Sequence, residues 1–472
     1  MKRLVSLYRS EYGCSPDRVE KLSGDGSSRQ YYRLINGEHS VIGTIGSEKK
    51  ENEAFLYFNG YFLSKHLPVP RVISVCESGE AYLQEDLGDI SLYDIIKDNG
   101  TKAPVTVSLL ENTMQVLARF HAAWKNDTDS GKSYPRDTMD RRAILWDLNY
   151  FKYCFVKPAG IDFDEDCLQD EFEAFADTVG EIEPKTLVLR DFQSRNVMIK
   201  NGMPYNIDYQ GARIGPALYD VASFLWQARI GLTEEEIWRY AEKYSTYASS
   251  LGIKIANNWK FDLSLIALFR MLQVLGAYGF RGLIEHKSRF VTPVPAALIN
   301  VKNLLESIGG NKYPCLRNII DRALSLDKFK VRMPDGQLTV KVYSFSYKKG
   351  IPEDFSGNGG GFVFDCRGML NPGRFECYRS LTGRDKPVMD FLEEQGEIQG
   401  FLESCFALTD KSVKNYIERG FSNLMICFGC TGGQHRSLYC ADKMAQHIVS
   451  SFECNVQLIH REQNINETLR RT

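Results

Sequence analysis

Leu189-Arg190-Asp191-Phe192-Gln193-Ser194-Arg195-Asn196, followed by Asn206-Ile207-Asp208-Tyr209, are the two stretches that decide how this sequence is interpreted. The first is a D-x-x-x-x-N loop, and the second puts another aspartate at the end of the next hairpin. Phosphoryl transfer from ATP needs a carboxylate that orients the attacking hydroxyl and oxygen ligands that hold Mg²⁺ on the phosphates. We expect Asp191 to be the catalytic base, and Asn196 and Asp208 to bind the metal.

Two further segments are expected to hold the ATP. A turn rich in glycine and serine can lay backbone N–H groups over phosphates, and such a turn precedes a predicted strand at Gly24, Asp25, Gly26, Ser27, Ser28 and Arg29. In a two-lobed kinase the hinge follows the end of a strand, where edge backbone groups can pair with adenine. The corresponding residues here are Gln84, Glu85, Asp86 and Leu87.

The hydrophobic pattern divides the chain into regions of different type. Strand-like alternation and one helical pattern, at 51–66, fill the first segment, and three- and four-residue spacing predicts helices between 104 and 306. A compact α/β pattern begins at residue 338. We therefore predict an N-lobe at 1–85, a helical C-lobe at 86–310, a linker at 311–335 and an α/β domain at 336–472.

Composition excludes several classes of protein. The 472 residues are 25% charged with a net charge of -2, so there is no overall attraction to nucleic acid or to an anionic membrane. No stretch reaches the roughly 18 consecutive apolar residues of a membrane span, and the N-terminus lacks a signal-peptide core. The 12 cysteines show no framework spacing, which predicts reduced thiols in a cytoplasmic protein. The single CxxC, 427–430, starts inside an apolar run, which argues against a redox site.

Residues 20–305 resemble the aminoglycoside phosphotransferase family, and most closely its anomeric kinase branch for N-acetylmuramate and N-acetylglucosamine. The strings that carry the resemblance are 27–33, 83–89, 190–198, 207–210 and 215–223. The resemblance implies an α+β protein-kinase-like fold, with a small β-rich N-lobe and a helical C-lobe, followed here by the separate α/β domain. It also implies ATP, Mg²⁺, and a small-molecule sugar as the substrate.

The sequence departs from this family at three places. Leu189 and Gln193 stand where the family loop usually has histidines, and the strand at 41–46 lacks the usual lysine. Arg29 or Arg195 is expected to supply the missing positive charge, and Glu53 is the candidate for the carboxylate on the predicted helix.

A second candidate site follows the apolar strand at 423–428. A glycine-rich turn between a strand and a helix presents N–H groups and a favourable dipole to an anion. We expect an anion cradle at Thr431, Gly432, Gly433, Gln434, His435, Arg436 and Ser437. Cys430 to Arg436 also fits the C-x₅-R loop of cysteine phosphatases, although Gly429 replaces the usual preceding histidine.

Residues 336–465 resemble the C-terminal domain of the RNase adaptor protein family (RapZ). The matching strings include 344–352, 364–367, 371–373, 381–385, 429–437 and 460–461. The resemblance implies a phosphosugar or nucleotide-sugar ligand, and RNA in some members. The family's N-terminal P-loop is absent and the charge is near neutral, which argues against RNA. A basic patch at the following residues would argue for it: Lys348, Lys349, Arg367, Arg374, Arg384, His435, Arg436 and His460.

Three hypotheses follow from these patterns. The first is an ATP-dependent kinase for an N-acetylated amino sugar, with a domain that senses a related phosphosugar. The second is a pseudokinase-like regulator whose C-terminal domain binds small RNA or a phosphosugar. The third is a kinase for another small alcohol, such as choline, homoserine or an aminoglycoside.

Overall fold

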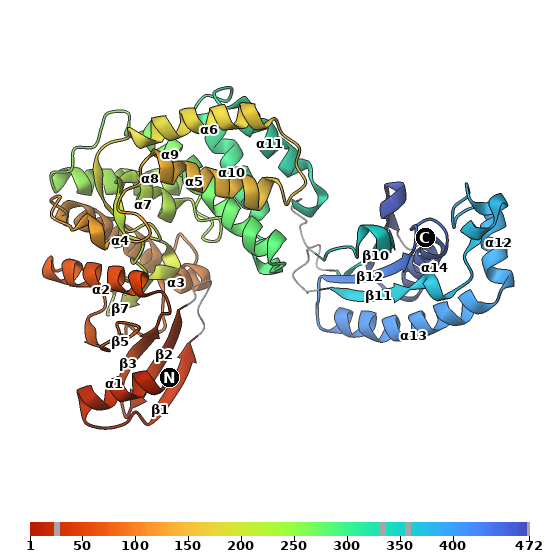
Figure 1. Ribbon diagram of the computed structural model, residues 1–472, viewed down its shortest axis with the longest axis horizontal. Coiled ribbons are helices and arrows are strands. Elements are labelled where there is room, and N and C mark those ends of the chain that lie inside the picture. The colour runs from red at the N-terminus through yellow and green to blue at the C-terminus, as the bar shows by residue number, and fades with distance from the viewer. Residues whose placement is uncertain (23–28, 330–336, 355–359, 470–472) are drawn as a thin grey trace. The chain divides into compact units, whose positions relative to one another are not determined.

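The computed structural model describes residues 1–22, 29–329, 337–354 and 360–469 (Figure 1). It divides into two units, Met1–Ile284 with Pro293–Leu326, and Glu285–Thr292 with Asp327–Thr472. The predicted nucleotide-binding turn, apart from Arg29, falls at 23–28 and lies outside the described residues.

The first unit begins with a five-stranded antiparallel sheet in the order β1-β2-β3-β5-β4. Leu4 and Tyr8 of helix α1 pack against this sheet in a small apolar core. Gly37, in the turn between β2 and β3, has the positive φ of 56° that glycine adopts without strain. The elements are α1 (Lys2–Tyr12), β1 (Arg18–Leu22), β2 (Gln30–Asn36), β3 (His39–Ile45), α2 (Lys49–Ser64), β4 (Val72–Val75) and β5 (Ala81–Glu85).

Helices and two short hairpins make up the rest of the first unit. Helix α9 is its buried centre and packs against α5, α7 and α10. The helices are α3 (Leu92–Asn99), α4 (Pro104–Ala123), α5 (Arg141–Phe151), α6 (Glu165–Gly180), α7 (Leu218–Leu225), α8 (Glu234–Ser250), α9 (Trp259–Gly279), α10 (Val294–Ser307) and α11 (Pro314–Ser325). The hairpins pair β6 (Lys185–Val188) with β9 (Arg213–Pro216), and β7 (Val197–Lys200) with β8 (Met203–Asn206).

Helix α11 falls inside the segment that the sequence assigns to a linker. It packs against α6 and α10 and belongs to the first unit. A disulfide joins Cys167 of α6 to Cys315 of α11, whereas the sequence predicts only reduced thiols. Glu171 also accepts the N–H groups of Cys315 and Leu316, at 2.6 and 2.9 Å, and so caps the start of α11.

One described helix, Trp259–Ile284, has the length and composition of a membrane span. Its most apolar window is 78% buried inside the first unit, so this helix is part of the core of that unit.

The second unit contains a five-stranded sheet in the order β11-β12-β10-β13-β14, in which only β14 runs antiparallel to its neighbour. Its strands are β10 (Thr339–Ser346), β11 (Gly361–Asp365), β12 (Asn423–Cys430), β13 (Asn455–His460) and β14 (Ile465–Leu469). Its helices are α12 (Lys386–Glu394), α13 (Glu397–Glu418) and α14 (Arg436–Ser451). Helix α13 runs unbroken from Glu397 to Glu418, and inside it the hydroxyl of the buried Thr409 donates to the carbonyl of Cys405 at 2.9 Å. The sequence did not predict β14.

Candidate functional site

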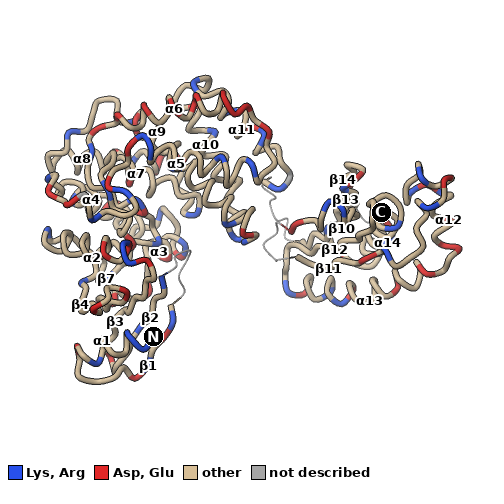
Figure 2. Tube along the Cα trace, viewed as in Figure 1, with Lys and Arg blue, Asp and Glu red and all other residues tan. Residues whose placement is uncertain are grey.

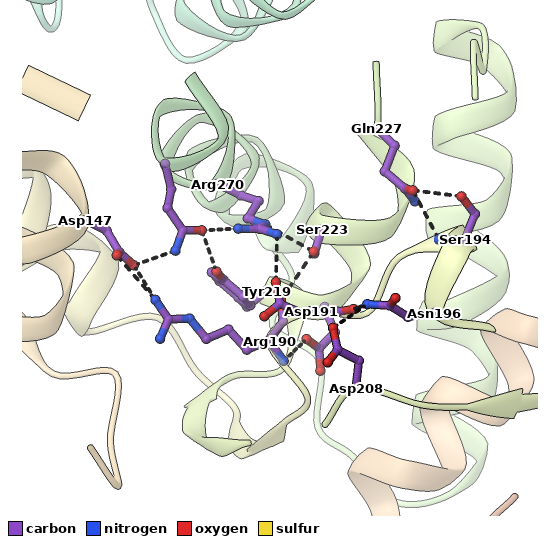
Figure 3. A network of polar contacts seen from close by, with 12 residues as sticks. Asp147, Arg190, Asp191, Ser194, Asn196, Asp208, Tyr219, Ser223, Gln227 and Arg270 are labelled. Atoms are coloured by element: carbon purple, nitrogen blue, oxygen red, sulfur yellow. Dashed lines mark hydrogen bonds and ion pairs between the residues drawn. The ribbon is translucent and has the colours of Figure 1, made fainter. Parts of the chain in front are cut away.

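The β7–β8 hairpin brings the three predicted catalytic and metal residues together (Figure 3). Val197 pairs with Asn206, and the N–H of Ile207 donates to the carbonyl of Asn196 at 2.9 Å. The Asn196 side chain donates Nδ2 to Oδ2 of Asp208 at 3.1 Å and to the backbone carbonyl of Asp191 at 2.8 Å. A local turn thus places all three residues around one point.

The electrostatics of this point favour a cation. Burial raises the pKa of Asp208, and the negative charge of Asp191 raises it further. Gln210 donates Nε2 to Oδ1 of Asp208 at 2.8 Å. Nδ2 of Asn196 donates to Oδ2 of Asp208 and to the backbone carbonyl of Asp191. Oδ1 of Asn196 therefore remains as an acceptor beside two carboxylates. Such an all-oxygen donor set fits Mg²⁺.

Asp191 is the exposed member of the group. Its side chain is 43% accessible, and Oδ1 lies 3.3 Å from Nη2 of Arg270. Arg270 is itself buried and also donates Nε to Ser223 at 3.1 Å. The carboxylate is therefore held by a fixed partner while it stays open to a reactant.

A buried aspartate holds the start of the loop at 189–196. Asp220 of α7 accepts the N–H groups of Leu189 and Arg190 at 2.6 and 2.9 Å, and contacts Nε2 of His121 at 3.1 Å. Nδ1 of His121 in turn lies 2.6 Å from the hydroxyl of Tyr244. Asp220 lies in the string 215–223, which carries part of the family resemblance, but the sequence alone did not predict its contacts with Leu189 and Arg190.

A second polar network supports Asp191 from the helical side (Figure 3). Arg190 lies 3.3 Å from both carboxylate oxygens of Asp147. Gln273 donates to Asp147 at 3.1 Å and accepts hydrogen bonds from Tyr219 and Arg270. The sequence did not predict this network; its one signal was Arg270, a charge inside the apolar run at 263–275.

A cleft of about 420 Å³ lies beside this point, between the sheet and the helical lobe. The predicted nucleotide and metal residues that line it are Arg29, Gln84, Glu85, Asp86, Leu87, Asn196 and Asp208. Within the described part of the chain, the buried Oε1 atoms of Gln84 and Gln210 have no hydrogen-bond partner. Both side chains line the cleft, and each offers an acceptor that suits an amino group of a ligand.

The charged side chains at the end of β5 are already paired. Arg33 donates to Asp86 at 2.6 and 3.1 Å, and Lys200 binds Glu85 at 2.6 Å. Lys200 also donates to the backbone carbonyl of Asp86 at 3.2 Å, so this carbonyl is already engaged.

Arg29 is a buried cation that lines the cleft. Its Nη2 donates to the carbonyl of Glu51 at 3.0 Å, and its Nε lies 3.7 Å from the Glu51 carboxylate. Glu53, the carboxylate that the sequence favoured, instead pairs with Lys49 at the surface. The carboxylate of α2 that faces Arg29 is therefore Glu51.

The glycine-rich loop of the second unit folds around the thiol of Cys430. Burial opposes ionisation, but hydrogen bonds from Ser437 and from the N–H groups of Ser437, Gly433 and Gly432 lower the pKa of Cys430. Sγ lies 3.1 Å from the Ser437 hydroxyl and 3.2 Å from the Gly433 nitrogen. Thr431 and Gly432 are exposed at the start of this loop.

Three side chains of the predicted anion cradle hold the adjacent backbone instead. Gln434 donates to the carbonyls of Arg379 and Leu381, and Nε2 of His435 lies 2.9 Å from the carbonyl of Tyr378. Arg436 is buried and donates Nη1 to the carbonyls of Arg367 and Met369, at 3.1 and 2.6 Å. These contacts fix the loops around the start of α14.

Three members of the suggested basic patch are paired with carboxylates. Arg367 pairs with Asp365, Lys349 with Glu462, and Arg384 with Asp442 and Glu467. Positive and negative residues alternate along both units (Figure 2).

Known proteins resemble the two units separately. The model of the phosphotransferase enzyme family matches residues 18–252, and the model of the RapZ C-terminal domain matches residues 338–464. These matches confirm the predicted protein-kinase-like fold with a separate C-terminal domain.

Two relatives share the second unit. A nucleotide-binding protein of Ruegeria sp. is 39% identical over 130 residues, which are 27% of this chain and 41% of that protein. One from Cupriavidus pinatubonensis is 38% identical over 132 residues, 28% of this chain and 42% of that protein. The chain thus spans less than half the length of these relatives.

Solved structures overlap the first unit. Choline kinase LicA from Streptococcus pneumoniae has a TM-score of 0.46 at 13% identity, covering 65% of this chain and 99% of that one. Amicoumacin kinase hAmiN, solved with AMP-PNP and Ca²⁺, has a TM-score of 0.46 at 12% identity, covering 63% and 92%. Scores this low support no conclusion about the substrate.

Proposed function

We propose that this chain, whose residues 18–252 match the phosphotransferase enzyme family and whose residues 338–464 match the RapZ C-terminal domain, is an ATP-dependent kinase for a hydroxyl of an N-acetylated amino sugar. The observation that carries the proposal is the convergence of Asp191, Asn196 and Asp208 beside a cleft of about 420 Å³. The sugar itself is proposed from the resemblance to the anomeric kinase branch.

The residues in the cleft and those beside it have separate roles in this proposal. Asp191 orients the attacking hydroxyl and accepts its proton, and Arg270 and Asp220 keep the loop in position. Asn196 and Asp208 hold Mg²⁺, which neutralises charge on the phosphates when it is bound. Arg29, fixed by Glu51, supplies the positive charge that the β3 lysine gives in related kinases. Gln84 and Gln210 offer acceptors to the nucleotide.

The test is phosphorylation of a panel of N-acetylated sugars by the full chain with Mg·ATP. Removal of a general base typically costs 10²- to 10⁴-fold in rate, so Asp191→Asn should reduce turnover by about that factor while ATP still binds. Phosphorus NMR of the product identifies the phosphorylated position. An absence of turnover on every sugar, or full activity in Asp191→Asn, would overturn the proposal.

The same assay, with choline, homoserine and an aminoglycoside added to the panel, separates two alternatives. Leu189, Gln193 and the missing β3 lysine favour a pseudokinase-like regulator, which would bind ATP without turnover. Turnover of choline, homoserine or an aminoglycoside in place of the sugars would point to another small-alcohol kinase.

For the second unit we propose a phosphosugar or nucleotide-sugar ligand at residues 431–437. The proposal is supported by the loop at the start of α14, where Thr431 and Gly432 are exposed and the helix dipole favours an anion. Calorimetric titration with glucosamine 6-phosphate tests it, and Thr431→Ala should weaken binding. An RNA ligand gains no support here, because Arg367, Lys349 and Arg384 are paired with carboxylates.

A further inference from the structure

Two cysteines and a glutamate lie together where α6 packs against α11 (Figure 1). Cys167 and Glu171 are four residues apart on α6, so their side chains share one face of that helix. Cys315 belongs to α11 and is bonded to Cys167. The two sulfur atoms and a carboxylate oxygen of Glu171 all lie within 4.8 Å of one another. Once the disulfide is reduced, these three atoms are a potential ligand set for one metal ion.

The carboxylate of Glu171 is already held in place. Its Oε1 accepts the N–H of Cys315 at 2.6 Å, and its Oε2 accepts the N–H of Leu316 at 2.9 Å. A carboxylate oxygen can accept two bonds, so each of these oxygens keeps a lone pair for a cation. Hydrogen bonds of this kind orient the ligands of metal sites in proteins.

Both cysteines lie in the first turn of a helix. Cys167 is the third residue of α6, and Cys315 is the second residue of α11. The N-terminal end of a helix favours negative charge and therefore favours the thiolate over the thiol. The thiolate is the form of cysteine that binds a metal ion.

The spacing of the three residues suits Zn²⁺, which takes cysteine and carboxylate ligands in a tetrahedral arrangement. Two thiolates on one zinc ion, each about 2.3 Å from it, lie about 3.8 Å apart. Side chains whose Cα atoms are 6.3 Å apart, as those of Cys167 and Cys315 are, can span this separation. Both cysteines and Glu171 are half-buried, so water can reach the fourth position.

We propose that Cys167, Glu171 and Cys315 form a redox-controlled zinc site, which binds Zn²⁺ when the disulfide is reduced and binds no metal when it is oxidised. A dithiol supplies the two electrons and two protons of the reduction and itself becomes a disulfide. Each cysteine sulfur leaves the broken bond as a thiol. Zinc binding then releases both protons to solvent and joins the two thiolates and the carboxylate.

This site is separate from the proposed kinase chemistry. None of its three residues lines the cleft of about 420 Å³. The site connects α6 to α11 in both states, through a covalent bond when it is oxidised and through the metal ion when it is reduced. The zinc site and the kinase proposal therefore stand or fall independently.

The test is a zinc titration of the full chain in two forms, oxidised and reduced. The reduced form is prepared with dithiothreitol and desalted without oxygen, and a coloured chelator competes for the metal. We expect the reduced chain to hold about one zinc ion more than the oxidised chain. The other cysteines are free in the structure, so the difference between the two forms isolates this pair.

Variants of the reduced chain identify the ligands. Cys167→Ser or Cys315→Ser should weaken zinc binding by at least about 100-fold, since changes even outside the ligand shell cost 10- to 100-fold. Glu171→Gln keeps both thiols and should weaken it about tenfold. Cys14→Ser removes an exposed thiol and Glu173→Gln an exposed carboxylate of α6, and neither should change the affinity.

Two further measurements separate a bound ligand set from loosely held metal. Zinc should raise the melting temperature of the reduced chain by several degrees and leave that of the oxidised chain unchanged. Co²⁺ in place of zinc should give the sulfur-to-metal absorption of a four-coordinate site, and Cys315→Ser should lose it.

Equal zinc binding by the oxidised and reduced chains would overturn the proposal. So would a reduced Cys167→Ser or Cys315→Ser variant that keeps the affinity of the unchanged sequence, because the metal would then lie elsewhere. An unchanged affinity in Glu171→Gln would refute the carboxylate as a ligand.

Discussion

At the scale of single residues, Asp220 stabilises the loop at 189–196, although it lies on a helix that follows this loop in sequence. It is fully buried and accepts two backbone N–H groups of the loop, while also contacting His121. A buried charge with several donors is costly to alter, because each donor that loses its partner stays desolvated.

Asp220→Asn should therefore lower both stability and turnover. An amide of the same size turns an N–H group toward one of the donors, and we expect a loss of about 2–4 kcal/mol in the free energy of unfolding. Denaturant unfolding followed by circular dichroism measures it. Asp98→Asn, at an exposed position on α3, is the matched control and should have almost no effect. Equal stability of the two variants would contradict this role of Asp220.

Asp208, unlike Asp220, is expected to lower the stability of the ligand-free protein when its carboxylate is ionised. Its pKa is raised by burial and by Asp191, so the ionised carboxylate destabilises the ligand-free protein as pH rises above the ordinary carboxyl range. In EDTA, Asp208→Asn should raise the melting temperature at pH 7 and abolish turnover. The gain should vanish near the ordinary carboxyl pKa of about 4, where the wild-type carboxyl is already protonated. A lower melting temperature of Asp208→Asn at pH 7 would refute this assignment.

At the scale of elements, α2 connects the sheet to the catalytic loop. Phe55 stacks between Tyr82 of β5 and Tyr209, at 5.0 Å from each ring. Asn59 donates to the hydroxyl of Tyr209 at 2.6 Å. Tyr209 directly follows Asp208 in sequence. The same helix carries Glu51, which fixes Arg29. The position of α2 therefore affects both Asp208, a proposed metal ligand, and Arg29, the buried cation that lines the cleft.

Two carboxylates of α2 provide a matched comparison. Glu51→Gln should weaken ATP binding about three- to tenfold, because Arg29 loses the charge that holds it in the cleft. Glu53→Gln removes only an exposed pair with Lys49 and should change the affinity less than twofold. Titration with AMP-PNP measures both variants. A larger effect of Glu53→Gln than of Glu51→Gln would contradict the assignment of Glu51 and support Glu53 as the functional carboxylate of α2.

The limits of sequence reasoning also follow from these elements. Asp191, Asn196 and Asp208 lie within one loop and one hairpin, so local spacing was enough to group them. Arg270, Asp147 and Gln273 come from two distant helices, and no local pattern records that α5 packs against α9. Glu51 and Glu53 differ only in which face of α2 they occupy. The choice between them required the position of Arg29, which only the packed structure supplies.

At the scale of the whole molecule, the chain holds two units with separate cores and separate candidate sites. The core of the second unit is built from the inner faces of its sheet and from α13 and α14. The cleft beside Asp191 is lined only by residues of the first unit, and the loop at 431–437 belongs to the second. A ligand that binds one folded unit stabilises that unit by mass action.

Scanning calorimetry of the full chain should therefore resolve two unfolding transitions. Mg·ATP at 100 times its dissociation constant adds about 2.7 kcal/mol to the unit that binds it, which shifts that transition by several degrees. A phosphosugar should shift the other transition alone. Asp191→Asn is the control, because it should keep the shift with ATP while losing turnover. A single cooperative transition that both ligands raise together would mean that the two units unfold as one body, and that each site senses occupation of the other.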